Sequence, residues 1–367
     1  MRIVLFASGE FALPTLAALC EPPHRDRHQV AVVVTQPDRP SGRGRARTPT
    51  PVHVHAGRLG LPTIATANVN DAAIIAELAQ YDADLGLVIA FGQKITRPVR
   101  ELFAHQCVNL HASLLPAYRG AAPYQWAIIN GEPRTGVTVF RLVDRMDAGP
   151  VFAQRETSIL PYERAAELHD RLSLIGVDAV LETLDRLERD PATNPVPQND
   201  DHATRARKLS KKDSHIRFDA PAQQVVNRIN GLWSWPGATC DYVPRTGPPT
   251  RVTIAHARVA HPPDAHTPID PDSTAVTDHR ADTAIVDASI TNTPVPDSSI
   301  ADSSIRAATV RERSAPGMFD DALHAATADG WIEILEIKPQ GGKLMSFRDF
   351  VNGRHVRPGD RLAAIES

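Results

Sequence analysis

The first half of the chain alternates apolar runs with amphipathic helical patterns, and no other feature constrains the fold as strongly. Residues 3–7, 30–35 and 85–90 are continuous runs rich in β-branched side chains. Such runs are typical of strands that are covered on both faces. The order β-α-β predicts an α/β fold with a Rossmann-like, doubly wound, mostly parallel sheet and right-handed crossovers. A long helical pattern over residues 162–188 closes this domain, which we place at residues 1–190.

The sequence changes character after residue 190. A Pro/Asn-rich linker with a short basic run occupies residues 191–212. Short β-like segments then predict a smaller C-terminal β-barrel domain, OB-like, over residues 213–367. Residues 261–316 fit neither domain, because they contain no Phe, Tyr, Trp or Gly and repeat the polar phrases DASI and DSSI. Such a segment buries too little apolar surface to offset its ordering entropy, so we expect a disordered insertion.

Composition excludes several classes of protein. A formal charge of −3 and a pI near 6.6 exclude binding to nucleic acid through bulk positive charge, so any RNA contact must come from local basic segments. Cys20, Cys107 and Cys240 are too few and too far apart for a disulfide framework or a zinc site. No apolar stretch is long enough to span a bilayer, and the first residues already form a strand pattern. We therefore expect a cytoplasmic protein without a metal or a membrane anchor.

The segment that follows residue 106 carries the most chemistry. Cys107 to His111 is predicted to be a strand, so Asn109 and His111, two residues apart, project to the same face. The Leu-Leu-Pro that follows ends this strand and places both side chains at its carboxyl edge, where open parallel sheets bind ligands. Farther along the chain, a second strand pattern runs into a loop that carries Asp147.

An amide, an imidazole and a carboxylate at one sheet edge suit the transfer of an acyl group to an amine. Asn109 and His111 can stabilise negative charge on the carbonyl oxygen, and His111, oriented by Asp147, can assist proton transfer. The simpler alternative is structural. A lone histidine at a strand end is usually a satisfied structural residue, and an aspartate before Ala-Gly can be only a turn residue.

The longer motif resembles the folate-dependent formyltransferases. The family string N-x-H-x-S-L-L-P, then R-G-A-A-P, then D-x-G matches the chain from Asn109 to Pro116, from Arg119 to Pro123, and at Asp147. The resemblance implies that Asn109, His111 and Asp147 are catalytic and that 10-formyltetrahydrofolate is the formyl donor. It also implies a folate site lined by Ser113, Leu114, Leu115 and Pro116, with Phe91 and Gly92 beside the pterin. Ser8-Gly9 departs from the usual Gly-Thr of a tight turn.

The acceptor must be argued from other segments. Arginines interleave with Pro and Gly between residues 35 and 50, which predicts a loop near the active edge rather than a helix. Basic residues on such a loop suit phosphate contact, although a solvated surface loop is the usual alternative. The run after the linker offers a second basic surface. The candidate RNA contacts are Arg39, Arg43, Arg45, Arg47, Lys208, Lys211 and Lys212.

The resemblance is strongest to members that formylate methionyl initiator tRNA, and it implies that the arginine loop meets the acceptor end while the barrel holds the stem. We expect the chain to act on this tRNA as a monomer. Two other functions stay open. An amino-sugar or other small-amine formyltransferase would have no use for the arginine loop, and a non-catalytic tRNA-binding protein would not need Asn109, His111 and Asp147.

Overall fold

The computed structural model describes residues 1–41, 46–190, 192–260 and 314–365, with only the backbone for residues 39–41 and 46. Met1–Ala260 and Pro316–Ser367 form one compact unit. Almost all of the predicted insertion lies outside the described residues. Within the described ranges, no helix combines the length and apolar character needed to cross a membrane.

The first half forms a seven-stranded sheet in the order β10-β9-β7-β6-β1-β2-β5. Five of these strands are mutually parallel, and β9 and β10 add an antiparallel edge. The strands are β1 (Arg2–Ala7), β2 (Gln29–Thr35), β5 (Thr63–Ala65), β6 (Leu85–Ile89), β7 (Cys107–His111), β9 (Arg134–Arg141) and β10 (Val151–Ser158). The predicted mostly parallel sheet is confirmed.

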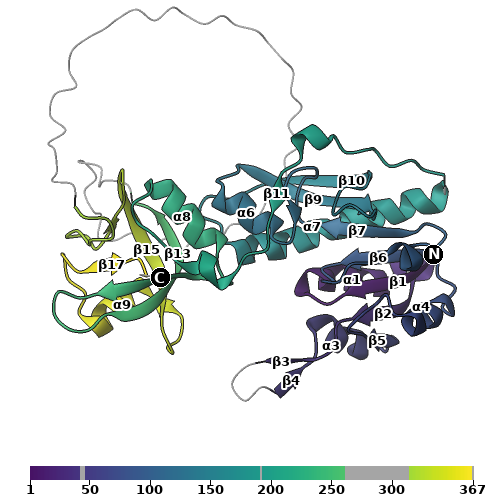
Figure 1. Ribbon diagram of the computed structural model, residues 1–367, viewed down its shortest axis with the longest axis horizontal. Helices are drawn as coiled ribbons and strands as arrows, with labels where there is room; N and C mark the ends of the chain where they lie inside the picture. Colours follow the sequence, from purple (N-terminus) through teal and green to yellow (C-terminus); the bar gives the residue numbers. More distant parts are fainter. Residues whose placement is uncertain (42–45, 191, 261–313, 366–367) are drawn as a thin grey trace, which may run out of the picture. The chain divides into compact units, whose positions relative to one another are not determined.

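Helices cover both faces of this sheet because successive strand residues point in opposite directions. In β1, Ile3 and Leu5 belong to the apolar cluster that includes α1, α3 and α7, whereas Val4 and Phe6 belong to the cluster that includes α4 and α5. Figure 1 shows α7 beside β9 and β10, the strands it packs against. The helices are α1 (Leu13–Cys20), α2 (His24–Arg27), α3 (Pro51–Arg58), α4 (Ala72–Ala79), α5 (Arg97–Arg100), α6 (Pro123–Ile129) and α7 (Ala165–Arg189), with a 3₁₀ turn η1 (Glu10–Ala12).

The strand order reverses direction between β1 and β6. From β1 the chain proceeds outward through β2 to β5, and from β6 it proceeds outward through β7 on the other side. Loops that leave the carboxyl ends of strands at such a switch point diverge and open a crevice for ligands. The segments after β6 and β7 therefore lie where the sequence places the candidate site.

The C-terminal part is a small antiparallel barrel in the order β14-β15-β13-β12-β17, with β16 beside β15. The residues from Gly317 to Phe319 close it, because Met318 bridges Arg361 of β17 and Phe319 bridges Ala325 of β14. Helix α8 packs against β13 and also against α6. The elements are α8 (Ala222–Gly231), β12 (Ala238–Val243), β13 (Thr250–Val259), β14 (Ala325–Ala326), β15 (Trp331–Pro339), β16 (Met345–Ser346), α9 (Phe347–Arg354) and β17 (Arg361–Ala363). The predicted barrel is confirmed.

Two short strand pairs lie outside these sheets. The backbone of β3 (Arg39–Ser41) pairs with β4 (Ala46–Thr48), so the predicted loop contains a short hairpin. The strand β8 (Arg119–Gly120) pairs in parallel with β11 (Arg205–Ala206). Part of the predicted 191–212 linker thus contacts the loop that follows the candidate site. The limits proposed for the domains, 1–190, 191–212 and 213–367, stay predictions.

Candidate active site

Asn109 and His111 lie on β7, between β6 and β9, on the face that the two-residue spacing predicts. Asn109 pairs in register with Val88 and Phe140, and His111 with Thr138. The His111 side chain is buried, and its ring meets the edge of Phe140 at 6.4 Å between centroids. Asn109 is half-buried, and its amide has no hydrogen-bond partner among the residues that the structure describes. A donor without a partner, at the carboxyl edge of the sheet, is available to a substrate.

The hydrogen bond of His111 determines which ring nitrogen carries the proton. Nε2 lies 2.9 Å from the backbone carbonyl oxygen of Tyr118. Because a carbonyl oxygen only accepts, Nε2–H must donate, and the neutral ring then has its lone pair on Nδ1. Nδ1 lies 4.0 Å from Oδ2 of Asp147, which is too long for a hydrogen bond. The two atoms can share a third group, such as a water molecule or a substrate amine.

Asp147 is held in the loop between β9 and β10 by backbone contacts. Its Oδ2 accepts the N–H of Gly120 at 2.8 Å, and its backbone has a φ of +51°, a left-handed conformation that aspartate tolerates better than most residues. Gly149 follows two residues later, and a Cβ there would meet the carbonyl oxygen of Arg141 at 1.7 Å. The tight return of the chain toward β9 therefore requires glycine at position 149 and restricts the residue type at position 147. The structure brings all three predicted catalytic residues to one edge.

The predicted folate segments follow β6 and β7, and their backbones are tightly held. The hydroxyl of Ser113 donates to the carbonyl of Ala117 at 2.6 Å, and the N–H of Leu115 donates to Thr138 at 3.0 Å. Leu115 is buried, whereas Leu114 and Pro116 are half-buried. Any contact of this segment with a ligand must therefore come from its backbone or from these half-buried side chains.

The Phe91 ring points into the core and packs on Phe6, with 5.6 Å between the ring centroids. The next residue, Gly92, lines a hollow at the surface. Gln36 donates to the carbonyl oxygen of Phe91 at 2.7 Å, and Gln36, Gly92 and Gln93 line this hollow together with Pro37, Asp38 and Ala67. We did not predict Gln36 and Gln93 from the sequence. Their positions just beyond the carboxyl ends of β2 and β6 are the signal that could have identified them.

The candidate RNA contacts fall into two groups. Arg43 and Arg45 lie outside the described residues, and only the backbone of Arg39 is described, whereas Arg47 is exposed on β4. The second group consists of Lys208, Lys211 and Lys212, which are exposed and make no ion pair with any described residue.

The neighbouring Arg207 has a different role from the lysines. Its guanidinium lies 4.9 Å from the ring centre of Trp126 and forms an ion pair with Asp213, an interaction that lowers the pKa of that carboxyl group. Arg207 thus anchors the segment, and the three lysines remain available to a phosphate backbone.

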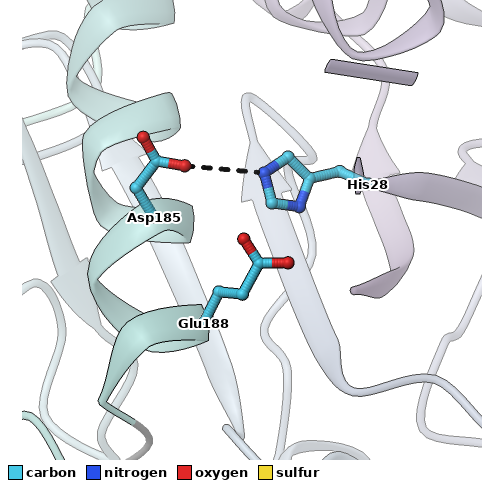
Figure 2. Close-up of side chains that lie close together, drawn as sticks. All are labelled: His28, Asp185 and Glu188. Atoms are coloured by element: carbon cyan, nitrogen blue, oxygen red, sulfur yellow. Dashed lines mark ion pairs between the residues drawn. The ribbon is translucent and has the colours of Figure 1, made fainter. Parts of the chain in front are cut away.

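One group of described residues has the composition of a metal site. His28, Asp185 and Glu188 bring three ligand atoms within 4.8 Å of one another, and Figure 2 shows both carboxylates projecting from α7 toward His28. Burial lowers the pKa of His28, whose ring nitrogens have no hydrogen-bond partner. However, Arg27 forms ion pairs with both carboxylates. The group also lies before β2, at the sheet edge opposite His111. It fits an ion-pair cluster better than a metal centre, and the absence of a metal stays a prediction.

Comparisons with known proteins show which family the chain resembles. Residues 1–184 match the family described as formyl transferase, and residues 208–355 match its C-terminal domain. A methionyl-tRNA formyltransferase of Thermodesulfovibrio yellowstonii is 31% identical over 97% of both chains. Another, of Solibacter usitatus, is 32% identical over 99% of this chain and 98% of its own.

Solved structures share the fold at lower identity. HypX from Aquifex aeolicus, in complex with tetrahydrofolic acid, is 17% identical with a TM-score of 0.55, covering 95% of this chain and 46% of HypX. A sugar N-formyltransferase from Shewanella is 16% identical with a TM-score of 0.51, covering 68% of this chain and 95% of its own.

Proposed function

Because this chain belongs to the formyl transferase family, we propose that it transfers the formyl group of 10-formyltetrahydrofolate to the amino group of methionyl initiator tRNA. The part of this proposal that concerns formyl transfer from the folate rests on the grouping of Asn109, His111 and Asp147 at the carboxyl edge of the sheet. The part that concerns the acceptor is supported by the match of the C-terminal domain and by relatives named methionyl-tRNA formyltransferase over nearly the whole chain.

Asn109, His111 and Asp147 each have a different role in a direct transfer of the formyl group. As the amine attacks the formyl carbon, the unpartnered amide of Asn109 donates to the formyl oxygen, which gains negative charge. Nδ1 of His111 is the ring atom with a free lone pair, so it accepts the proton that the attacking nitrogen loses. Asp147, 4.0 Å away, stabilises the charged imidazolium. The proton then passes to the folate nitrogen as its bond to the formyl carbon breaks, which needs no serine or cysteine nucleophile.

We assign the folate to the crevice after β6 and β7. The residues that would hold it are the backbone of Phe91 and Gly92 and the segment Ser113, Leu114, Leu115 and Pro116. The hollow beside Gly92 supports this placement, since amide side chains and backbone groups line it. Such groups suit the donors and acceptors of a pterin.

The RNA is assigned to two basic surfaces on one polypeptide. The arginine segment, Arg39, Arg43, Arg45 and Arg47, would meet the acceptor end, and Lys208, Lys211 and Lys212 would contact the stem. Since one chain carries the donor site and both surfaces, we propose that it acts as a monomer. The cysteines Cys20, Cys107 and Cys240 are free thiols, which fits a reducing compartment, and we propose the cytoplasm.

One assay separates this function from its alternatives. Purified protein is incubated with 10-formyltetrahydrofolate and either methionyl initiator tRNA or a nucleotide-linked amino sugar, and the formylated product is quantified. We expect acid-stable formylmethionine in the first case only. Formylation of the sugar alone would favour an amino-sugar enzyme. Binding of tRNA without any product would favour a non-catalytic RNA-binding protein.

A further inference from the structure

The segment from Val196 to Ala206 makes backbone contacts with both loops that hold the partners of His111. Val196 exchanges two backbone hydrogen bonds with Val151, at 2.7 and 2.8 Å, just after the Asp147 loop. Thr204 accepts the N–H of Arg119 at 2.9 Å with its carbonyl, and the N–H of Tyr118 at 2.8 Å with its hydroxyl. This segment, which we name the strap, therefore fixes both the carbonyl that His111 contacts and the loop that carries Asp147.

Two strap side chains reach the Asp147 loop: Asp200 accepts a hydrogen bond from Arg145, whereas Gln198 contacts the backbone of Asp147 itself. Nε2 of Gln198 donates to the carbonyl oxygens of Asp147 and Gly149, at 2.9 and 2.6 Å. Its Oε1 accepts two hydrogen bonds from the guanidinium of Arg119, at 3.1 and 2.7 Å. Both amide hydrogens and the amide oxygen are used, so the orientation of this side chain is fully determined.

The far side of Arg119 is fixed as well. Arg119 is buried, and its guanidinium also pairs with Asp200 of the strap at 2.8 Å. Hydrogen bonds from Arg119 and Arg145 lower the pKa of Asp200. The strap thus clamps the Asp147 loop in two ways: through Gln198, which is hydrogen-bonded to Arg119, and through the ion pair between Asp200 and Arg145.

The need for such a clamp follows from the geometry of Asp147. Its left-handed backbone is a conformation that costs free energy unless its surroundings enforce it. Among the described residues, only the N–H of Gly120 donates a hydrogen bond to its carboxylate. We propose that Gln198 is a positioning residue, which holds the backbone of Asp147 so that its carboxylate faces Nδ1 of His111. The catalytic part of this proposal rests on the proposed function.

The test uses the full-length protein with Gln198→Met, which keeps the size of the side chain and removes its hydrogen bonds. We expect kcat to fall on the order of ten- to a hundredfold with little change in KM for either substrate, because a loop displacement of about 1 Å affects chemistry more than binding. In an Asp147→Ala background the same substitution should cause no further loss, since Gln198 acts through Asp147. A matched control is Gln29→Met, at the opposite edge of the sheet, where Gln29 accepts a hydrogen bond from Arg2.

A second variant separates positioning from a purely structural role. Gln198→Glu can still pair with Arg119, but it places an oxygen against the carbonyls of Asp147 and Gly149. It should therefore lose as much rate as Gln198→Met. If Gln198 only anchored Arg119, Gln198→Glu would retain its activity.

Hydrogen exchange tests the clamp without any substrate. On ¹⁵N-glycine-labelled protein, the Gly120 amide should exchange faster in Gln198→Met than in the wild type, while Gly131, which bonds to Ile128 at 2.9 Å, should not change. Unchanged exchange at Gly120, or a rate loss that persists in the Asp147→Ala background, would overturn the proposal. If the wild type lacked formylation of methionyl-tRNA, the proposed function would fail and the exchange result would still decide on the clamp.

Discussion

At the residue scale, the two-residue spacing of Asn109 and His111 was enough to predict the face on which they lie. The partners of His111 could not be predicted in the same way. The carbonyl of Tyr118 is a backbone group, and every residue has one, so the sequence carries no mark of it. Gln198 is equally hidden, because it lies 51 positions from Asp147 in a segment whose composition indicates only a linker. A side-chain contact to a main-chain atom cannot be predicted from the sequence, because it requires no particular residue type at the position that supplies the backbone group.

The first prediction concerns the unpartnered amide. Asn109→Ala should lower kcat about 10²- to 10³-fold, the usual cost of removing one oxyanion donor. The melting temperature should stay close to that of the wild type, because the amide makes no hydrogen bond with a described residue whose loss would destabilise the fold. His111→Ala should cost as much or more, since it affects charge and proton transfer together. Steady-state kinetics and thermal unfolding check both variants, with exposed Asn352→Ala as the control. Turnover close to wild type at saturating substrates would contradict the assignment.

At the scale of elements, the strands of the main sheet were predictable, and the small pairings were not. Residues 107–111 form β7 as expected, with Cys107, Val108 and Leu110 buried in the sheet. In contrast, β8 and β11 are two-residue strands joined across a long stretch of sequence. Their pairing depends on Gly120, where a Cβ would meet the carbonyl oxygen of Ala206 at 2.3 Å. Such close approaches are set by tertiary packing, which no local pattern records.

The second prediction concerns the barrel and its dependence on pH. Asp360 is buried beside β17 and accepts hydrogen bonds from the Tyr242 hydroxyl at 2.7 Å and from the N–H groups of Arg245 and Arg357 at 2.8 and 2.9 Å. Burial alone would raise the pKa of Asp360, but these hydrogen bonds outweigh it and hold the pKa below its ordinary value. A lowered folded pKa contributes stability above the unfolded pKa of about 3.9, and this stability is lost as the pH falls through the folded pKa.

Asp360→Asn should therefore lower the free energy of unfolding by about 2–4 kcal/mol at pH 7, because hydrogen bonds to a buried charge are removed or weakened. The difference from the wild type should shrink as the pH is lowered below about 4. Urea titrations between pH 7 and the acidic range measure this difference in the free energy of unfolding. Asp241→Asn is the control, because Asp241 pairs with Arg251 at the surface and should change stability by less than about 1 kcal/mol. A deficit in Asp360→Asn that did not depend on pH would contradict the role given to the charge.

At the scale of the whole molecule, a chain of net negative charge must bind RNA through local surfaces. Neutralising Lys208, Lys211 and Lys212 to glutamine should make tRNA binding less dependent on salt, by up to about 0.7–0.9 slope units for each phosphate group that the lysines no longer neutralise. Affinity measured across a series of salt concentrations gives the slope. Arg25→Gln, on α2 at the sheet edge opposite His111, should leave it unchanged. An unaltered slope in the triple variant would remove this surface from the RNA site.

The last prediction concerns the 56 residues from 261 to 316, which we expect to be dispensable for catalysis. Their aspartates would repel RNA phosphates. The described ends of the barrel strands also make a short bridge feasible. Ala260 donates to the carbonyl of Trp331 at 2.9 Å, Trp331 pairs with Ala326, and Gly317 donates to the carbonyl of Ala326 at 2.8 Å. Ala260 and Gly317 are therefore at most three strand spacings of about 4.8 Å apart. A bridge of eight extended residues reaches roughly 26 Å, which is enough to join them.

Replacing residues 261–316 by an eight-residue Gly/Ser bridge should stabilise the protein by up to about 1.7 kcal/mol, because a sevenfold shorter loop costs less entropy to close. The formylation rate with methionyl-tRNA should stay equal to that of the full chain. Urea unfolding and steady-state kinetics on the same preparation measure the two quantities. A composition-matched shuffle of the segment separates length from sequence, since it keeps the loop long and should change neither quantity. A folded deletion variant with a large loss of rate would show that the segment takes part in function. If the shuffled variant lost as much rate, that function would depend on the sequence of the segment rather than on its length.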